Sequence, residues 1–212
     1  MSIIIKEQIL ERIAKGDIAF SPPLDSLQLQ SHSVDLRMGF TFLVPKLWQV
    51  TKNGREALHL DYLSADRPPY FEVVELEQGQ CFEILPQEHI LVSTLESIKV
   101  PNDLMAVLYP RSSVNRKGLS VDLSGIVDAG YEGQLVIPVR NSTTGQTIKL
   151  YPGERFCQVV FEELTSAVSD PKKSKYHKKD IITGALAEET SQEGDFIKKG
   201  DMSGLKKQYP AR

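Results

Sequence analysis

The sequence has few of the features that mark disulfide-linked, zinc-binding or membrane proteins. Its two cysteines, Cys81 and Cys157, lie far apart and show neither CxxC nor Cys/His spacing, which argues against a disulfide framework and a zinc site. No apolar run reaches the roughly 18 residues that span a membrane. The start of the chain carries charged residues where a signal peptide needs an apolar segment. We therefore expect a cytoplasmic protein with no membrane partner.

The chain also lacks an excess of positive charge. It has 25 Lys and Arg against 28 Asp and Glu, a net charge of -3, so it has no basic footprint for a nucleic acid partner. The composition does not exclude a small anionic ligand. With 212 residues, 41% of them hydrophobic, the chain can bury one sizeable core. We expect a main domain over residues 1–164 and a tail over residues 165–212.

Short apolar segments separated by turn residues predict an all-β sandwich or barrel. They are rich in β-branched and aromatic residues and show no helical periodicity; they cover residues 40–45, 71–76, 81–85, 90–95, 104–109, 135–139, 147–151 and 156–161. Ile5, Ile9 and Ile13 recur every fourth residue before Gly16, which predicts a short N-terminal helix. Residues 46–70 are less regular, and the Asn53-Gly54 turn signal predicts a surface insertion there.

The tail is rich in lysine and poor in large apolar groups. Five lysines are crowded into one short part of it: Lys172, Lys173, Lys175, Lys178 and Lys179. One interpretation is a solvated, partly disordered segment. The other is a flap that folds over a polyanionic ligand, and the sequence does not choose between them.

The candidate site residues gather between residues 110 and 141. Arg111, Ser112 and Ser113 provide a guanidinium fork and two hydroxyls, groups that suit phosphate oxygens. Asp128 follows on an Asp-Ala-Gly-Tyr corner. Polar groups on tight turns between strands are typical of a site presented by loops of a rigid β scaffold.

Four segments resemble, in order, the first four motifs of the trimeric dUTPase and dCTP deaminase superfamily. They are residues 33–36 (SVDL), 110–113 (PRSS), 125–134 (GIVDAGYEGQ) and 152–161 (PGERFCQVVF). This resemblance implies a distorted jelly-roll β-barrel that assembles as a homotrimer. The N-terminal helix, the insertion at 46–70 and the Lys175-Tyr176 pair are more similar to the deaminase branch.

One position departs from the deaminase pattern. Deaminases of this family carry a glutamate ten positions after the aspartate of the third motif, where it serves as acid and base at cytosine C4. Here that position is Pro138, which has no titratable group. This departure favours the dUTPase branch, in which dUTP is hydrolysed to dUMP and pyrophosphate with Mg²⁺ on the triphosphate.

The resemblance implies a role for each matching residue. Asp128 matches the aspartate that activates water, and Tyr131 the aromatic ring that lies against the deoxyribose. Five residues match or replace phosphate-binding groups: Arg111, Ser112, Ser113, Gln158 and, in place of the arginine of the missing Gly-rich fifth motif, Lys175. Asp35 matches the acid that organises the metal through water.

The resulting prediction is a homotrimeric dUTP diphosphatase that uses Mg²⁺ and is built on a deaminase-like frame. Two alternatives stay open. One is a dCTP deaminase, monofunctional or bifunctional, with a relocated acid. The other is a catalytically poor regulatory module that binds a pyrimidine nucleotide, which the absent fifth motif favours.

Overall fold

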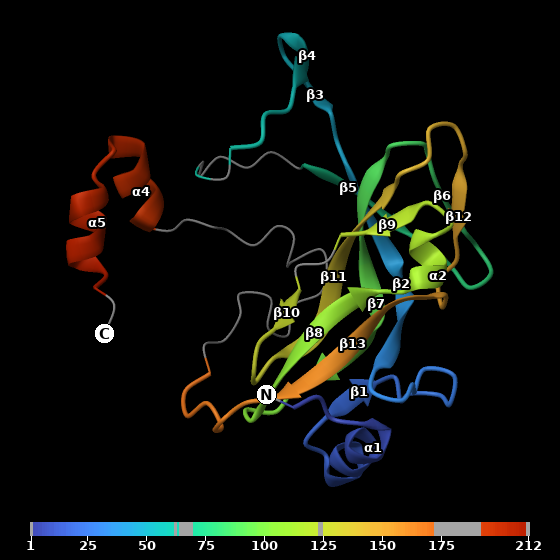
Figure 1. Cartoon of the computed structure of the whole chain (residues 1–212). Coiled ribbons are helices and arrows are strands. Elements are labelled where there is room, and N and C mark those ends of the chain that lie inside the picture. Colours follow the sequence, from blue (N-terminus) through green and yellow to red (C-terminus); the bar gives the residue numbers. More distant parts are fainter. Residues whose placement is uncertain (1, 62, 64–69, 123–124, 172–191, 211–212) are drawn as a thin grey trace. The chain divides into compact units, whose positions relative to one another are not determined.

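The computed structural model describes residues 2–61, 63, 70–122, 125–171 and 192–210 (Figure 1). The chain divides into two compact units. The first comprises Met1–Val44 and Val73–Ala185, and the second comprises Pro45–Glu72 and Leu186–Arg212. The boundary at residue 164, expected from composition, stays a prediction.

Nine strands form the main sheet in the part of the chain that the structure describes. Its path is β10-β8-β13-β2-β7-β11-β9, with β1 also paired to β7 and β5 to β2. The strands are β1 (Ala19–Ser21), β2 (Val34–Pro45), β5 (Phe71–Glu75), β7 (His89–Lys99), β8 (Leu104–Pro110), β9 (Leu119–Val121), β10 (Ile126–Val127), β11 (Glu132–Asn141) and β13 (Arg155–Glu163). β6 (Phe82–Ile84) and β12 (Ile148–Leu150) form a separate antiparallel pair. Figure 1 shows the main sheet curling around its own interior.

The core lies inside this curled sheet because apolar residues alternate with partly exposed ones along the strands. In β11, buried and partly exposed positions alternate from Glu132 to Val139, as the period of two of a half-buried strand requires. The largest fully buried side chains include Leu36, Met38, Phe42, Ile90, Ile98, Leu104, Phe156 and Phe161. Gly39 lies where β2 and β7 approach closely, since a Cβ there would lie 2.2 Å from Ser93 Oγ.

The N-terminal helix is confirmed as α1 (Lys6–Lys15). Gln8 Oε1 accepts a hydrogen bond from the Ile5 amide at 3.0 Å and satisfies one free donor at the helix start. Gly16 ends the helix in the left-handed region, φ 77°, as the sequence predicts. Ile9 is fully buried, while Ile5 precedes the helix and is half exposed.

In the second unit, the insertion forms a hairpin of β3 (Trp48–Thr51) and β4 (Gly54–Ala57) that turns at Lys52 and Asn53. The tail contains α4 (Gln192–Lys199) and α5 (Met202–Gln208), which the tail composition did not predict. The lysine cluster at 172–179 and the flap interpretation fall outside the described residues.

The all-β fold class and its short N-terminal helix are confirmed. None of the helices among the described residues is long and apolar enough to cross a membrane. The cytoplasmic location stays a prediction.

Candidate functional site

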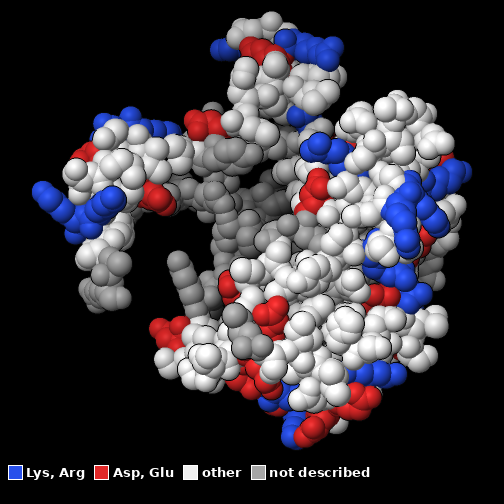
Figure 2. All heavy atoms as spheres, in the orientation of Figure 1, with Lys and Arg blue, Asp and Glu red and all other residues white. Residues whose placement is uncertain are grey.

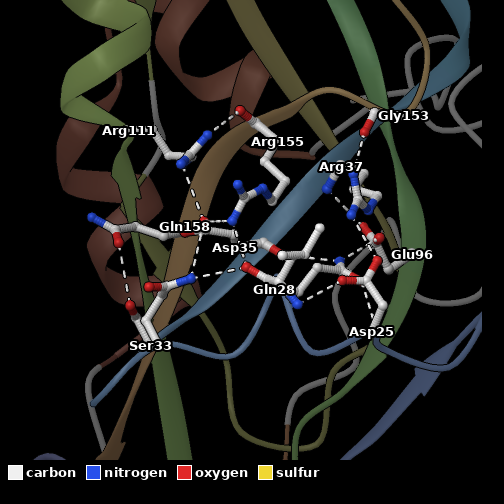
Figure 3. A network of polar contacts seen from close by, with 12 residues as sticks. Asp25, Gln28, Ser33, Asp35, Arg37, Glu96, Arg111, Gly153, Arg155 and Gln158 are labelled. Carbon is white, nitrogen blue, oxygen red and sulfur yellow. Dashed lines mark hydrogen bonds and ion pairs between the residues drawn. The ribbon is translucent and has the colours of Figure 1, made fainter.

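Three neighbouring strands bring the first, second and fourth sequence motifs together. β13 lies between β2 and β8, and Gln158 is paired with Asp35 on one side and with Tyr109 on the other. Arg111 directly follows β8, and its amide donates to the Phe156 carbonyl at 3.1 Å. Residues more than a hundred positions apart in sequence therefore meet at one end of these strands (Figure 3).

Asp35 is the centre of this cluster. Its side chain is only 3% exposed, and Oδ2 lies 3.1 Å from Arg111 Nε and 3.1 Å from Arg155 Nη1. Burial raises the pKa of the Asp35 carboxyl, and the charges of Arg111 and Arg155 partly offset this effect. The carboxylate thus fixes two guanidinium groups that remain about a quarter exposed, which suits them to holding an anionic ligand.

A surface cavity of about 670 Å³ adjoins this cluster. Its basic lining residues are Arg37, Arg111, Lys117, Lys149 and Arg155. Figure 2 shows blue side chains gathered over α2 (Ser112–Asn115) and β12. A cavity of this size with convergent cations suits a ligand with several phosphates.

The predicted hydroxyls lie at the edge of this cavity. Ser112 and Ser113 are exposed at the start of α2, and Ser113 lines the cavity. Gln158 is half-buried, and its side-chain oxygen accepts a hydrogen bond from Ser33 Oγ at 3.2 Å. These groups and Arg111 form one half of the site that the sequence predicts.

Asp128 and Tyr131 form the other half, at a turn. The Tyr131 amide donates to the Asp128 carbonyl at 3.2 Å, and Gly130 takes φ 77°, a conformation that favours glycine. Asp128 is exposed. The Tyr131 ring is 7% exposed, its hydroxyl donates to the Gln134 carbonyl at 2.6 Å, and burial raises its pKa to about 12. Within its own chain, this ring is part of the core.

The two halves do not meet within one chain. Val127 pairs with Ala106 in antiparallel register, so Asp128 lies level with Met105. Arg111, just past the end of β8, lies six residues from Met105, and at a rise of about 3.3 Å per residue this is about 20 Å away. One chain therefore provides two separate half-sites.

A buried network supports the first half-site, and sequence reasoning missed it. Gln28 Nε2 donates to the Asp35 carbonyl at 3.0 Å and to Glu96 Oε1 at 2.7 Å, while Glu96 Oε2 accepts from the Arg37 amide at 2.9 Å (Figure 3). Burial raises the pKa of Glu96. Arg155 also belongs to this half-site. It lies in the fourth sequence motif, residues 152–161, which could have identified it as a site residue.

A metal ion finds no ready ligand set here. In the described ranges, no group of three or more His, Cys, Asp or Glu residues could hold one. Asp35 Oδ2 is engaged by two guanidinium groups, which does not suit direct coordination of a metal, and its expected indirect role through water stays a prediction. Lys175 lies outside the described residues.

These features define a β-barrel with a cationic cavity, and comparison with known proteins gives the family. The dCTP deaminase-like family model matches residues 3–164, and the chain belongs to this family. It is 35% identical over 185 residues to the "dCTP deaminase, dUMP-forming" of Methanobrevibacter smithii, covering 84% of this chain and 91% of the relative. It is 31% identical over 207 residues to the protein of that name from Methanosphaera stadtmanae, covering 94% and 100%.

A solved structure supports the fold. The crystal structure of 2'-deoxycytidine 5'-triphosphate deaminase from Agrobacterium tumefaciens is similar with a TM-score of 0.58 and 21% identity. The similar region covers 76% of this chain and 48% of that one.

These findings correct the sequence-based function. The resemblance to the superfamily is confirmed, but the interpretation as a plain dUTP diphosphatase is wrong, because the relatives are named dCTP deaminases that form dUMP. Pro138 is a single substitution, whereas the similarity to these deaminases extends over 82–94% of the chain.

Proposed function

We propose that this protein converts dCTP to dUMP, which makes it an enzyme of the dCTP deaminase kind. The observation that carries this proposal is the similarity to dUMP-forming dCTP deaminases over 82–94% of the chain. The buried Asp35, which fixes Arg111 and Arg155 beside a cationic cavity, supports a triphosphate substrate. The overall reaction consumes dCTP and two waters and releases dUMP, ammonia and pyrophosphate.

The half-site around Arg111 binds the triphosphate in this proposal. The Arg111 guanidinium, the Ser112 and Ser113 hydroxyls and the Gln158 amide donate hydrogen bonds to phosphate oxygens. Lys175 adds a positive charge. The positions of Arg111 and Ser113 on the cavity wall support this assignment.

The half-site around Asp128 acts on the nucleoside side. Asp128 is exposed and free to orient the water that attacks the α-phosphorus during pyrophosphate release. Tyr131 shapes the turn and packs near the deoxyribose, where a close wall leaves no room for a ribose hydroxyl. The described residues offer Mg²⁺ no fitting ligand set, so these roles belong to the side chains alone.

Assembly of several chains completes the site. Asp128 and Arg111 of one chain lie about 20 Å apart along β8, too far for both to contact the reacting end of one nucleotide. A homotrimer in which Asp128 of one protomer meets Arg111 of its neighbour brings them together. The separation within one chain supports this arrangement.

A second candidate function is nucleotide binding without deamination, as in a regulatory module. Pro138 specifically favours it, because proline cannot transfer a proton from the position at which the family resemblance places an acid. In this case dCTP binds and no ammonia appears.

The test is incubation of the purified chain with dCTP, dUTP or dTTP, each with and without Mg²⁺, with products resolved by chromatography. The proposal predicts dUMP from dCTP. Unchanged dCTP at high enzyme concentration, together with measurable dCTP binding, would overturn it in favour of the regulatory module.

A further inference from the structure

Deamination needs a group that moves protons at cytosine C4, and the family resemblance assigns this group to position 138, on the outer surface of β11. Leu135, Ile137 and Val139 point into the core. Gln134, Val136 and Pro138 alternate with them and are partly exposed. None of these three outward side chains is an acid, so an acid at this place comes from another element of the site.

The neighbouring strand β9 places Asp122 beside Pro138. Val121 pairs with Val139, and the Asp122 amide donates to the Pro138 carbonyl at 2.9 Å, so the antiparallel register continues by one residue. Val121 is buried and Asp122 is exposed, as alternation along a strand requires. Directly opposed residues of this kind have Cβ atoms about 5 Å apart. The Asp122 side chain therefore lies on the same outward surface as Pro138 and next to it.

The Asp122 carboxylate is oriented by a hydrogen bond but forms no ion pair among the described residues. Ser120 Oγ donates to Asp122 Oδ1 at 2.6 Å, which orients the group. Across the ranges for which the structure gives positions, Asp122 takes part in no ion pair. Oδ2 is thus available to a water or a ligand.

The charged and titratable groups near Asp122 lie two residues away in the strand register. Arg140 pairs with Ser120 on one side and with His89 on the other. Burial, and then the charge of Arg140, lower the pKa of His89, while Asp122 acts in the opposite direction. A neutral imidazole at pH 7 leaves Arg140 as the main positive charge near Asp122.

We infer that Asp122 is the acid–base residue of deamination, replacing the acid that Pro138 does not provide. This inference rests on the proposed function. The Asp122 carboxylate takes a proton from water as the water oxygen bonds to C4, and the C4–N3 π electrons move to N3, which receives that proton from Asp122. The carboxylate then takes the hydroxyl proton and passes it to the amino nitrogen. C4=O forms, the C4–N bond breaks, ammonia leaves and the carboxylate is restored.

Other carboxyl groups suit this step less well. Glu96 is 2% exposed, and both of its oxygens accept hydrogen bonds from groups of its own chain. Glu132 is the first residue of β11 and lies six positions before Pro138, about 20 Å along the strand. Asp122 alone among these three combines exposure with the position beside Pro138.

The test compares wild type, Asp122→Asn and Asp122→Glu, with Glu75→Gln as a matched control, an exposed carboxyl on β5. Ammonia release over a range of dCTP concentrations gives kcat and KM, and circular dichroism checks folding. For Asp122→Asn we expect at least a hundredfold loss in kcat, on the order of what general acid–base catalysis contributes, with KM changed less than about threefold. Glu75→Gln behaves as wild type, and Asp122→Glu keeps more activity than Asp122→Asn because it retains the carboxylate.

The outcomes separate the inference from the function on which it rests. Ammonia release by Asp122→Asn within a few-fold of wild type overturns the role of Asp122 and leaves dCTP deamination intact. If Asp122→Asn does not fold, a folded Asp122→Ser that releases ammonia within a few-fold of wild type overturns the role. A wild type that binds dCTP and releases no ammonia overturns the proposed function itself, and the role of Asp122 with it.

Discussion

Replacing Asp35 with asparagine tests whether one buried carboxylate holds the phosphate half-site together. Asparagine keeps the size of the side chain but removes the charge that faces Arg111 and Arg155, both 3.1 Å away. Its amide nitrogen donates hydrogen bonds, so wherever it faces a guanidinium two donors oppose each other. We expect the two arginines to turn toward solvent.

The size of the effect follows from burial. Removing one partner of a fully buried ion pair costs about 3–5 kcal/mol. The Arg111 and Arg155 side chains are 27% and 26% exposed, so water partly replaces the lost partner. Loss of the carboxylate also removes the cost of burying its charge. We therefore expect a loss of about 2 kcal/mol in the free energy of unfolding, and weaker dCTP binding.

The assay is urea unfolding of wild type, Asp35→Asn and the matched control Asp25→Asn. Asp25 pairs with Arg37 at 2.6 Å, but its side chain is 48% exposed and water screens the pair, so its loss should cost less stability than the loss of Asp35. Calorimetry with dCTP completes the comparison. If Asp35→Asn loses no more stability and no more dCTP affinity than Asp25→Asn, Asp35 does not hold the phosphate half-site together.

Two further predictions concern pH and assembly. Burial raises the pKa of Glu96 above its ordinary value of 4.5, so the protonated carboxyl contributes stability that is fully present below pH 4.5 and is lost as pH rises through the raised pKa. The unfolding free energy of wild type minus that of Glu96→Gln should therefore fall as pH rises from 4.5 to 7, measured by urea unfolding; a difference that rises with pH contradicts this. Light scattering at working concentration should give the mass of a trimer, and a monomer would contradict the shared site.

Local patterns in the sequence predict most of the barrel. Alternating apolar residues predict β11, and Gly16 predicts the end of α1, because both signals depend on neighbours within a few residues. Helices α4 and α5 were not predicted, since they are short, polar and rich in lysine. The fold is thus predicted best where its causes are local.

The site is predicted only in part because its contacts are not local. The motifs identify Asp35 and Arg111, but nothing in the sequence pairs Gln28 with Glu96, which are 68 residues apart. The distance between Asp128 and Arg111 also depends on strand register. Register likewise places Asp122 beside Pro138, so the sequence shows the loss of an acid at 138 but not a neighbouring acid.

The central claim is that one protein removes both the amino group and the pyrophosphate of dCTP. The most direct measurement follows ammonia, pyrophosphate and dUMP together during a single time course of wild type with dCTP. We expect one ammonia and one pyrophosphate for each dUMP formed. Pyrophosphate without ammonia, or no turnover of bound dCTP, would contradict it.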